Sequence, residues 1–177
     1  MLVPGLYPFF RRHIQQGLSG ANFNQPAVID YVSDLLARFA RVSAVFPFRN
    51  SDSRPIDTIA GLLVEWHAAL GDDHRQPPGR TSETVLLHHV ADYALFMSGL
   101  FRERLRARGQ VAYYREQGAG AFARCARFES RPARAQVLYR VSRDFQPIAD
   151  ALDALWHQRL PAGSASGLSP LAALWQA

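Results

Sequence analysis

The sequence predicts an all-α fold, an irregular bundle of five to seven helices around a central apolar helix at about 82–98. Apolar residues recur at alternating spacings of three and four along several segments, which is the period of an amphipathic helix. No stretch of the sequence shows the sustained apolar–polar alternation that is typical of a half-buried strand. The chain has 177 residues, of which 48% are hydrophobic, enough for one domain with a single sizeable core.

The first helix is expected at 26–46. Pro26 stands where the first turn of a helix accepts proline, and Pro47 would end the helix. The apolar stripe between the two prolines is formed by Val28, Val32, Leu35, Phe39, Val42 and Phe46.

A second helix is expected at about 55–70 and a third from Ser82 to at least Met97. The polar stretch 71–80 contains two prolines and two glycines and predicts a loop between them. Apolar residues occur nearly all round the third helix, which is typical of a central, buried helix.

The second half of the chain predicts further helical segments. A short segment at 102–109 ends at Gly109, a residue type common just after a helix. A helix at about 110–128 contains Gly118 and Gly120, which predict a close helix crossing or a local break. Another helix starts at 130–132 and extends to about 159, and Pro147 is expected to kink or split it.

We expect residues 1–160 to form a single helical domain, with 161–177 as a flexible linker and a short C-terminal helix.

Near the N-terminus, Arg11 and Arg12 follow the apolar stretch instead of preceding it, so this segment is not expected to be a secretory signal. No run of about 18 apolar residues occurs, so no membrane span is expected. The single cysteine cannot form an internal disulfide and fits a reduced, cytoplasmic setting.

Two adjacent histidines and one aspartate interrupt the apolar run from Leu86 to Phe101. His88 and Asp92 are four residues apart, so their side chains lie on one face of a helix. A carboxylate there can fix the tautomer of a histidine that acts as a base or a ligand, so the two residues are the candidate catalytic pair. The favoured interpretation is structural, in which the pair satisfies its own polar atoms inside the core. His89 is expected to be a packed aromatic residue.

Metal and thiol chemistry have weaker support. The chain contains none of the HExxH, CxxC or P-loop patterns. His67 could join His88 in space as a candidate pair of metal ligands, although nothing in the sequence requires it. Cys125 lies in a helical pattern between Phe122 and Phe128 and is expected to be a buried small hydrophobe. The sequence names no cofactor.

The positive charge is concentrated in one part of the chain. All 20 basic residues are arginine, and residues 99–145 carry eleven of them with four acidic residues, a net charge of +7. Arg124, Arg127, Arg131 and Arg134 repeat at spacings of three and four, which gives one face if a helix persists across that junction. Arginine clusters bind phosphates and carboxylates, so this face predicts a nucleic acid or an acidic protein as partner. The alternative is a solvated basic surface.

A longer pattern runs through residues 90–128: an aspartate, a Leu-Phe pair, a glycine before two apolar residues, a Tyr-Tyr pair and a second glycine. Its positions are Asp92, Leu95, Phe96, Gly99, Leu100, Phe101, Tyr113, Tyr114 and Gly118. This pattern resembles a set of uncharacterised bacterial cytosolic proteins over about a fifth of the chain, with Ala91 where those proteins usually have glycine. The resemblance implies no activity. It implies a shared scaffold in which Gly99 lies at a turn of the chain, and ordinary packing would place one tyrosine ring inward and the other outward.

The sequence favours a non-enzymatic protein-interaction module, an adaptor or assembly factor that binds another protein or itself, and it leaves open whether the protein is an enzyme. The protein-interaction hypothesis rests on a set of aromatic residues outside the helical stripes, because exposed aromatic residues are typical of partner surfaces. They are Phe9, Phe10, Phe46, Phe48 and Trp175. One alternative is an enzyme, or a cofactor- or metal-binding protein, with a buried pocket at His88 and Asp92. The other is phosphate or nucleic-acid binding through the arginine-rich segment 102–143.

Overall fold

A computed structural model describes residues 6–19, 25–40, 58–64 and 80–159. Every regular element in these residues is a helix, so the all-α prediction is confirmed. The helices are α1 (Leu6–Ser19), α2 (Pro26–Phe39), α5 (Arg80–Leu100), α6 (Arg102–Ala107), α7 (Val111–Phe128), α8 (Pro132–Arg143) and α9 (Phe145–Arg159). A further helical segment occupies 59–64. The linker and helix expected at 161–177 lie outside the described residues.

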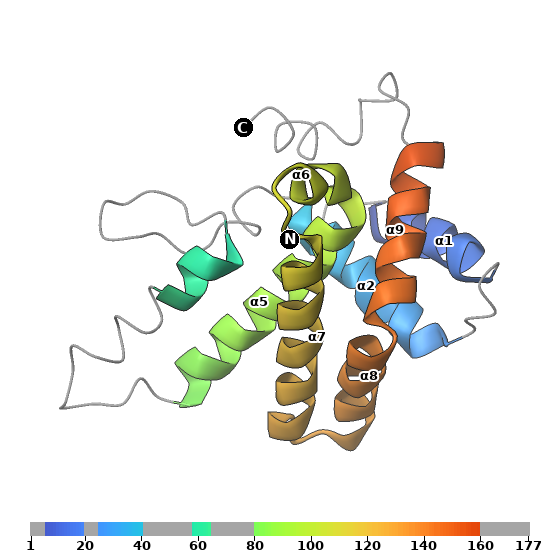
Figure 1. Cartoon of the computed structure of the whole chain (residues 1–177). Helices are drawn as coiled ribbons and strands as arrows, with labels where there is room; N and C mark the ends of the chain where they lie inside the picture. Colours follow the sequence, from blue (N-terminus) through green and yellow to red (C-terminus); the bar gives the residue numbers. More distant parts are fainter. Residues whose placement is uncertain (1–5, 20–24, 41–57, 65–79, 160–177) are drawn as a thin grey trace.

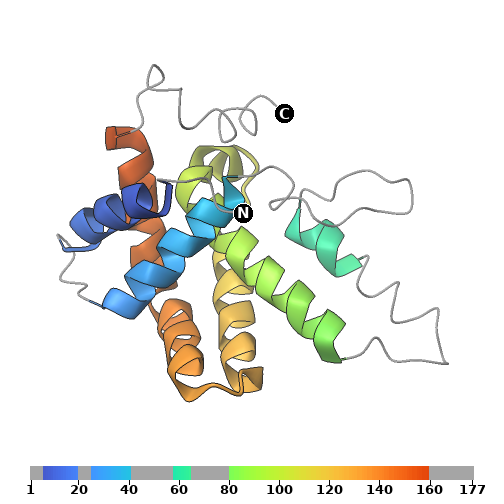
Figure 2. The same cartoon turned by 180° about the vertical axis from the view of Figure 1, so that it is seen from behind.

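The helix α5 is the central helix that the sequence predicted. Between Leu86 and Leu100 every residue except His88 is buried, and α5 contacts α2, α6, α7 and α9. Figure 1 shows α5 crossing the middle of the molecule with α7 beside it, and Figure 2 shows α1 and α2 on the opposite side. Because α5 meets neighbours on several sides, few positions on it are left for polar side chains.

The helix α1 is an element that the sequence analysis did not anticipate. Phe10, Ile14 and Leu18, four residues apart, are buried, and α1 packs on α2 and α9. Pro8 lies in the first turn of α1, where the missing N–H has no intrahelical partner to lose. Phe10 was expected outside the bundle and is instead in the core, while Phe9 packs against the core from its edge.

The breaks between helices follow proline and glycine. Gly109 adopts φ +65° after α6, as its predicted role at the end of a helix requires. The helix expected at 130–159 is split at Asp144 into α8 and α9, and Pro147 is the third residue of α9. The helix expected at 26–46 ends earlier, at Phe39, with Ala40 donating its N–H to Leu36. Residues 41–57 lie outside the described part of the chain.

Two glycines allow close helix crossings. A Cβ atom on Gly118 would lie 2.6 Å from the Cβ of Ala94 and 2.6 Å from the ring of Phe145, so α7 packs directly against α5 and α9 there. A Cβ atom on Gly99 would lie 2.5 Å from the Cβ of Leu152. Gly99 is helical, so its expected place at a turn was wrong; the chain leaves α5 two residues later, at Phe101.

The two glycines of α7 should respond oppositely to a methyl group. Gly118→Ala should lower the free energy of unfolding, because overpacking costs about 1–3 kcal/mol and Ala94 cannot yield without moving its backbone. Gly120→Ala has no atom within 4 Å of the added Cβ, so it should raise the free energy of unfolding by up to about 1 kcal/mol through helix propensity. Urea unfolding of both variants tests this contrast, and equal effects would contradict the close crossing.

Candidate functional site

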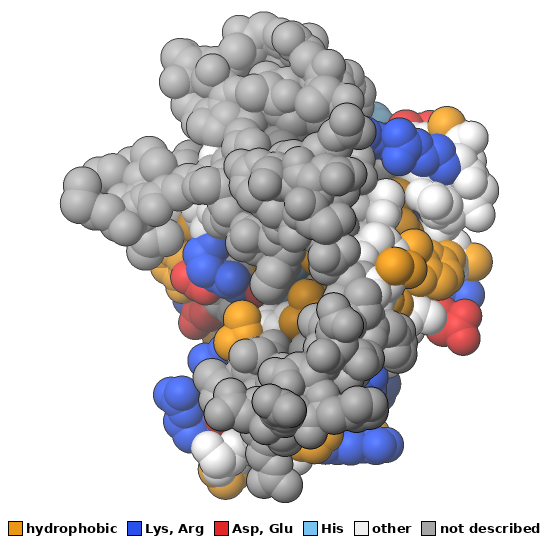
Figure 3. Space-filling view, turned by 90° about the vertical axis from the view of Figure 1, so that its left-hand side faces the viewer, with side chains coloured by type: hydrophobic (Ala, Val, Ile, Leu, Met, Phe, Trp, Pro, Cys, Tyr) orange, Lys and Arg blue, Asp and Glu red, His pale blue; other side chains and the backbone are white. Residues whose placement is uncertain are grey.

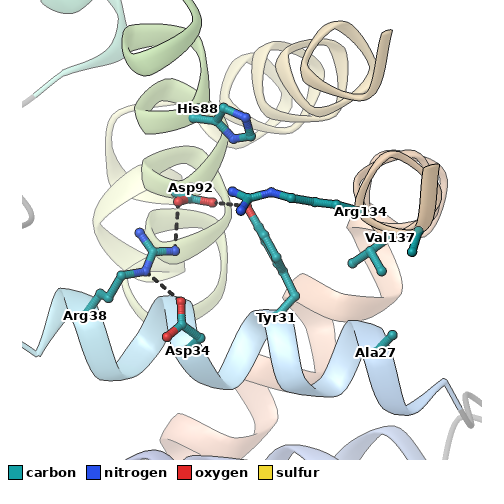
Figure 4. Close-up of a pocket in the computed structure, with 9 residues that line it drawn as sticks. Ala27, Tyr31, Asp34, Arg38, His88, Asp92, Arg134 and Val137 are labelled. Carbon is teal, nitrogen blue, oxygen red and sulfur yellow. Dashed lines mark hydrogen bonds and ion pairs between the residues drawn. The ribbon is translucent and has the colours of Figure 1, made fainter. Parts of the chain in front are cut away.

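A pocket of about 650 Å³ opens between α2, α5 and α8 (Figure 4). The residues that line it are Ala27, Tyr31, Asp34, Arg38, His88, Asp92, Ala133, Arg134 and Val137. Three of them are apolar, and the other six can donate or accept hydrogen bonds. The pocket therefore brings together His88, Asp92 and one residue of the predicted basic face, Arg134.

Helical spacing explains why these side chains meet. On α2 the lining residues are separated by four, three and four positions, which places them on one face beside the buried stripe that contains Val28 and Val32. On α5 the spacing of four puts His88 above Asp92. The first turns of α8 supply Ala133, Arg134 and Val137. Each helix thus buries one face in the core and turns an adjoining face toward the pocket.

Asp92 lies at the floor of the pocket, and only 7% of its side chain is exposed. Its Oδ1 accepts a hydrogen bond from the Tyr31 hydroxyl at 2.6 Å, and its Oδ2 accepts one from the guanidinium of Arg38 at 3.0 Å. Burial raises the pKa of Asp92, while the charge of Arg38 and the Tyr31 hydrogen bond oppose this rise. These two donors from α2 are the reason that a carboxylate can occupy the central helix.

The donors to Asp92 are themselves held in place. Arg38 donates from Nε to Asp34 at 2.8 Å, so its guanidinium is shared between two carboxylates. Burial and the charge of Asp92 raise the pKa of Tyr31 well above its ordinary value. Tyr31 therefore stays protonated, and its O–H donates a hydrogen bond to Asp92. The phenolic oxygen can then only accept a further hydrogen bond.

His88 is partly buried and shares the pocket with Asp92, but the hydrogen bonds of Asp92 come from Tyr31 and Arg38. The idea that the two residues of α5 satisfy each other was therefore wrong. Burial lowers the pKa of His88; the charge of Asp92 opposes this, and the charge of Arg134 adds to it. The imidazole is consequently neutral near pH 7, with one nitrogen that donates and one that accepts.

Arg134 reaches across the mouth of the pocket from α8 toward His88 and Asp92 (Figure 4). Its Nε lies 3.0 Å from Glu129 Oε2, and 47% of its side chain is exposed. Glu129 also lies 3.7 Å from the Nε of Arg131 and accepts a hydrogen bond from the backbone N–H of that residue. Arg134 is thus the only residue of the predicted basic face that lines the pocket.

The predicted basic face is interrupted. Since α7 ends at Phe128 and α8 begins at Pro132, no single helix joins Arg124 and Arg127 to Arg131 and Arg134. All four side chains are exposed. Arginine side chains lie around the lower end of the molecule in Figure 3, the end at which α7 and α8 meet in Figure 1. The four arginines form a scattered basic surface around a turn instead of a stripe.

The other expected groups lie apart from the lining of the pocket or outside the described residues. His67 lies outside the described residues, so its proposed role as a metal ligand with His88 stays a prediction. Within the ranges that the structure describes, no three His, Cys, Asp or Glu residues are grouped so as to hold a metal ion. His89 is buried against the rings of Phe39 and Tyr93, as a packed aromatic residue would be.

Two further expectations on buried groups are confirmed. Cys125 is fully buried, and burial raises the pKa of its thiol to about 12, so it is a small core residue and no nucleophile at neutral pH. Of the tyrosine pair, Tyr114 is 2% exposed and Tyr113 is 36% exposed, so one ring points inward and the other outward.

The sequence analysis missed Tyr31, Asp34 and Arg38. A signal was present, because polar residues at spacings of three and four beside an apolar stripe mark a second helix face. What the sequence could not show is that this face meets α5.

A comparison with protein-family models, curated proteins and solved structures finds no match to the chain. None of the helices in the described segments has the length and apolar character needed to span a membrane.

Replacing His88 by asparagine should change how stability depends on pH. The unfolded chain takes up a proton on His88 near its ordinary pKa of 6.5, whereas the folded protein resists this proton because its pKa for His88 is lowered. The free energy of unfolding of the wild type should therefore fall relative to that of His88→Asn as the pH decreases from about 7.5 to about 5.5.

Urea unfolding of the two proteins across this range measures the difference. Above about pH 7.5 the difference should be nearly constant, since His88 is then almost entirely neutral in both the folded and the unfolded wild type. A difference that stays constant at all pH values, or one that favours the wild type in acid, would contradict the neutral imidazole.

Proposed function

We propose that this protein binds a small polar molecule in the pocket between α2, α5 and α8. The observation that carries the proposal is the carboxylate of Asp92, buried in the central helix and yet placed at the floor of an open pocket. Removing a carboxylate from water costs several kcal/mol unless donors surround it, and here Tyr31 and Arg38 provide them.

The dimensions and the lining of the pocket support a small ligand. Pockets for small molecules commonly have volumes of about 300–1,000 Å³ and combine apolar walls with a few convergent polar groups. Here Ala27, Ala133 and Val137 supply apolar wall. A purely structural polar contact in a core would leave no space beside it, because interiors pack to crystal-like density.

His88 favours a second candidate, an enzyme that removes a proton from the bound molecule. Its neutral imidazole is the group in the pocket suited to accept a proton near pH 7. Tyr31 keeps its own proton, and so does the nearby thiol of Cys125. The geometry favours binding over proton removal, because binding requires only the hydrogen-bond donors and acceptors and the apolar side chains that line the pocket.

The role as a protein-interaction module stays a prediction with less support. Phe9 and Phe10, two of the residues that motivated it, belong to the core or pack on it, and the other three lie outside the described residues. Phe128 and Tyr139 are each 61% exposed. Single exposed aromatic residues are common on monomers and do not by themselves indicate a partner.

The test is to purify the protein from its own host and to identify small molecules released on denaturation by mass spectrometry. Ala133→Phe would place a ring in the pocket from an exposed position on α8. Ala112→Phe is the matched control, an exposed position on α7 outside the pocket. We expect a molecule that accompanies the wild type and Ala112→Phe and is lost from Ala133→Phe.

Two results would contradict the proposal. One is a molecule that is retained equally by the folded Ala133→Phe protein. The other is the failure of any molecule to accompany the wild type, together with no change in its melting temperature when it is mixed with a metabolite extract of the host.

A further inference from the structure

We propose that the ligand is a small monocarboxylate that also carries an O–H or N–H donor: Arg134 binds its carboxylate, and Asp92, Tyr31 and His88 receive its donor. This inference rests on the proposed function and names the class of molecule that the pocket takes. It follows from a difference between the inner and the outer end of the pocket.

The outer end offers hydrogen-bond donors. The two arginines of the pocket differ, because Arg38 already bonds to Asp34 and Asp92, whereas Arg134 is held through its Nε by Glu129. In the described part of the chain, the two terminal nitrogens of Arg134 donate no hydrogen bond, and its ion pair with Glu129 is closest at Nε. They form the edge of a guanidinium that binds a carboxylate in bidentate fashion, and Figure 4 shows this side chain extended across the pocket.

The inner end offers mainly acceptors. The hydroxyl of Tyr31 donates to Asp92, so its oxygen can only accept from a ligand. The carboxylate of Asp92 has accepting positions beyond the two that Tyr31 and Arg38 occupy. The neutral imidazole of His88 adds one more acceptor. A ligand group that donates a hydrogen bond therefore fits this end, whereas a second carboxylate there would face the charge of Asp92.

The charge around Arg134 favours a single negative charge on the ligand. The lining contains two arginines and two aspartates, and Glu129 stands beside Arg134 outside it. One guanidinium shared with a glutamate matches a monocarboxylate better than a phosphate monoester, which carries nearly two negative charges at pH 7. Glu129 consequently tunes how strongly Arg134 attracts the ligand.

The experiment follows the backbone amide signals of the isotope-labelled full-length protein by NMR while simple probes are added. The four probes are 4-hydroxybutyrate, which has both groups, butyrate, which has only the carboxylate, butane-1,4-diol, which has hydroxyl groups and no carboxylate, and glycerol 3-phosphate, which is nearly a dianion at pH 7. We expect 4-hydroxybutyrate to shift the amides of pocket residues at the lowest concentration. Tighter binding by any of the other three would overturn the assignment, as would the absence of pocket shifts with 4-hydroxybutyrate.

Two variants give opposite expected effects. Arg134→Gln should weaken 4-hydroxybutyrate binding about tenfold or more, because a hydrogen bond to a charged group is lost. Glu129→Gln should strengthen it by about two- to fivefold, because the carboxylate of Glu129 no longer competes with the ligand for the charge of Arg134. Neither variant should alter binding of butane-1,4-diol. Arg127→Gln makes the same change of charge as Arg134→Gln, but at an exposed position of α7 outside the pocket. It should leave all four affinities unchanged.

Failure of this inference is distinguishable from failure of the proposed function. If butane-1,4-diol shifts the pocket amides as strongly as 4-hydroxybutyrate and Arg134→Gln changes neither, the pocket binds ligands but not as carboxylates. If a molecule accompanies the purified protein but carries no carboxylate, the ligand class is wrong and the pocket remains a binding site.

Discussion

The carboxylate of Asp92 between Tyr31 and Arg38 is the interaction on which the site depends. It joins residues that are 61 and 54 positions apart in the chain and links the central helix α5 to α2. A charge in the central helix of an apolar bundle is stable only when donors from another element reach it. These donors join the polar face of α2 to α5 at the floor of the pocket, which α8 completes.

Close packing elsewhere sets the position of this carboxylate. Gly118 lets α7 touch α5 at Ala94, half a turn beyond Asp92, and Gly99 lets α9 approach the end of the same helix. The ring of Tyr31 meets that of Phe122 on α7 edge to face, with centroids 5.9 Å apart. The floor of the pocket is therefore supported by the core, whereas its rim is formed by more exposed charged side chains.

Sequence patterns predicted the helices well wherever periodicity or proline was decisive. The apolar character of 86–100 identified the central helix, and Pro147 marked the division between α8 and α9. The helix α1 was not anticipated, although Pro8 is acceptable in a first turn. A stripe of Phe10, Ile14 and Leu18 was present all along, but it is short and lies among other aromatic residues.

The candidate site was predicted in part. His88 and Asp92 were recognised as a pair because their spacing places them on one helix face. Their expected mutual contact was wrong, since α2 brings stronger donors, a phenol and a guanidinium, to the carboxylate. Such a contact between distant segments depends on how helices pack, and one sequence contains no direct signal for it. The same limit explains why Arg134 could be named but not placed at the pocket.

A double-mutant cycle on Tyr31 and Asp92 tests the central claim most directly. The free energies of unfolding of the wild type, Tyr31→Phe, Asp92→Ala and the double variant are measured at pH 7 by denaturant titration. The account predicts a coupling energy of about 1.5–3 kcal/mol, the range for a hydrogen bond to a charged group. A coupling energy near zero would show that Tyr31 does not hold the carboxylate, and it would contradict the account.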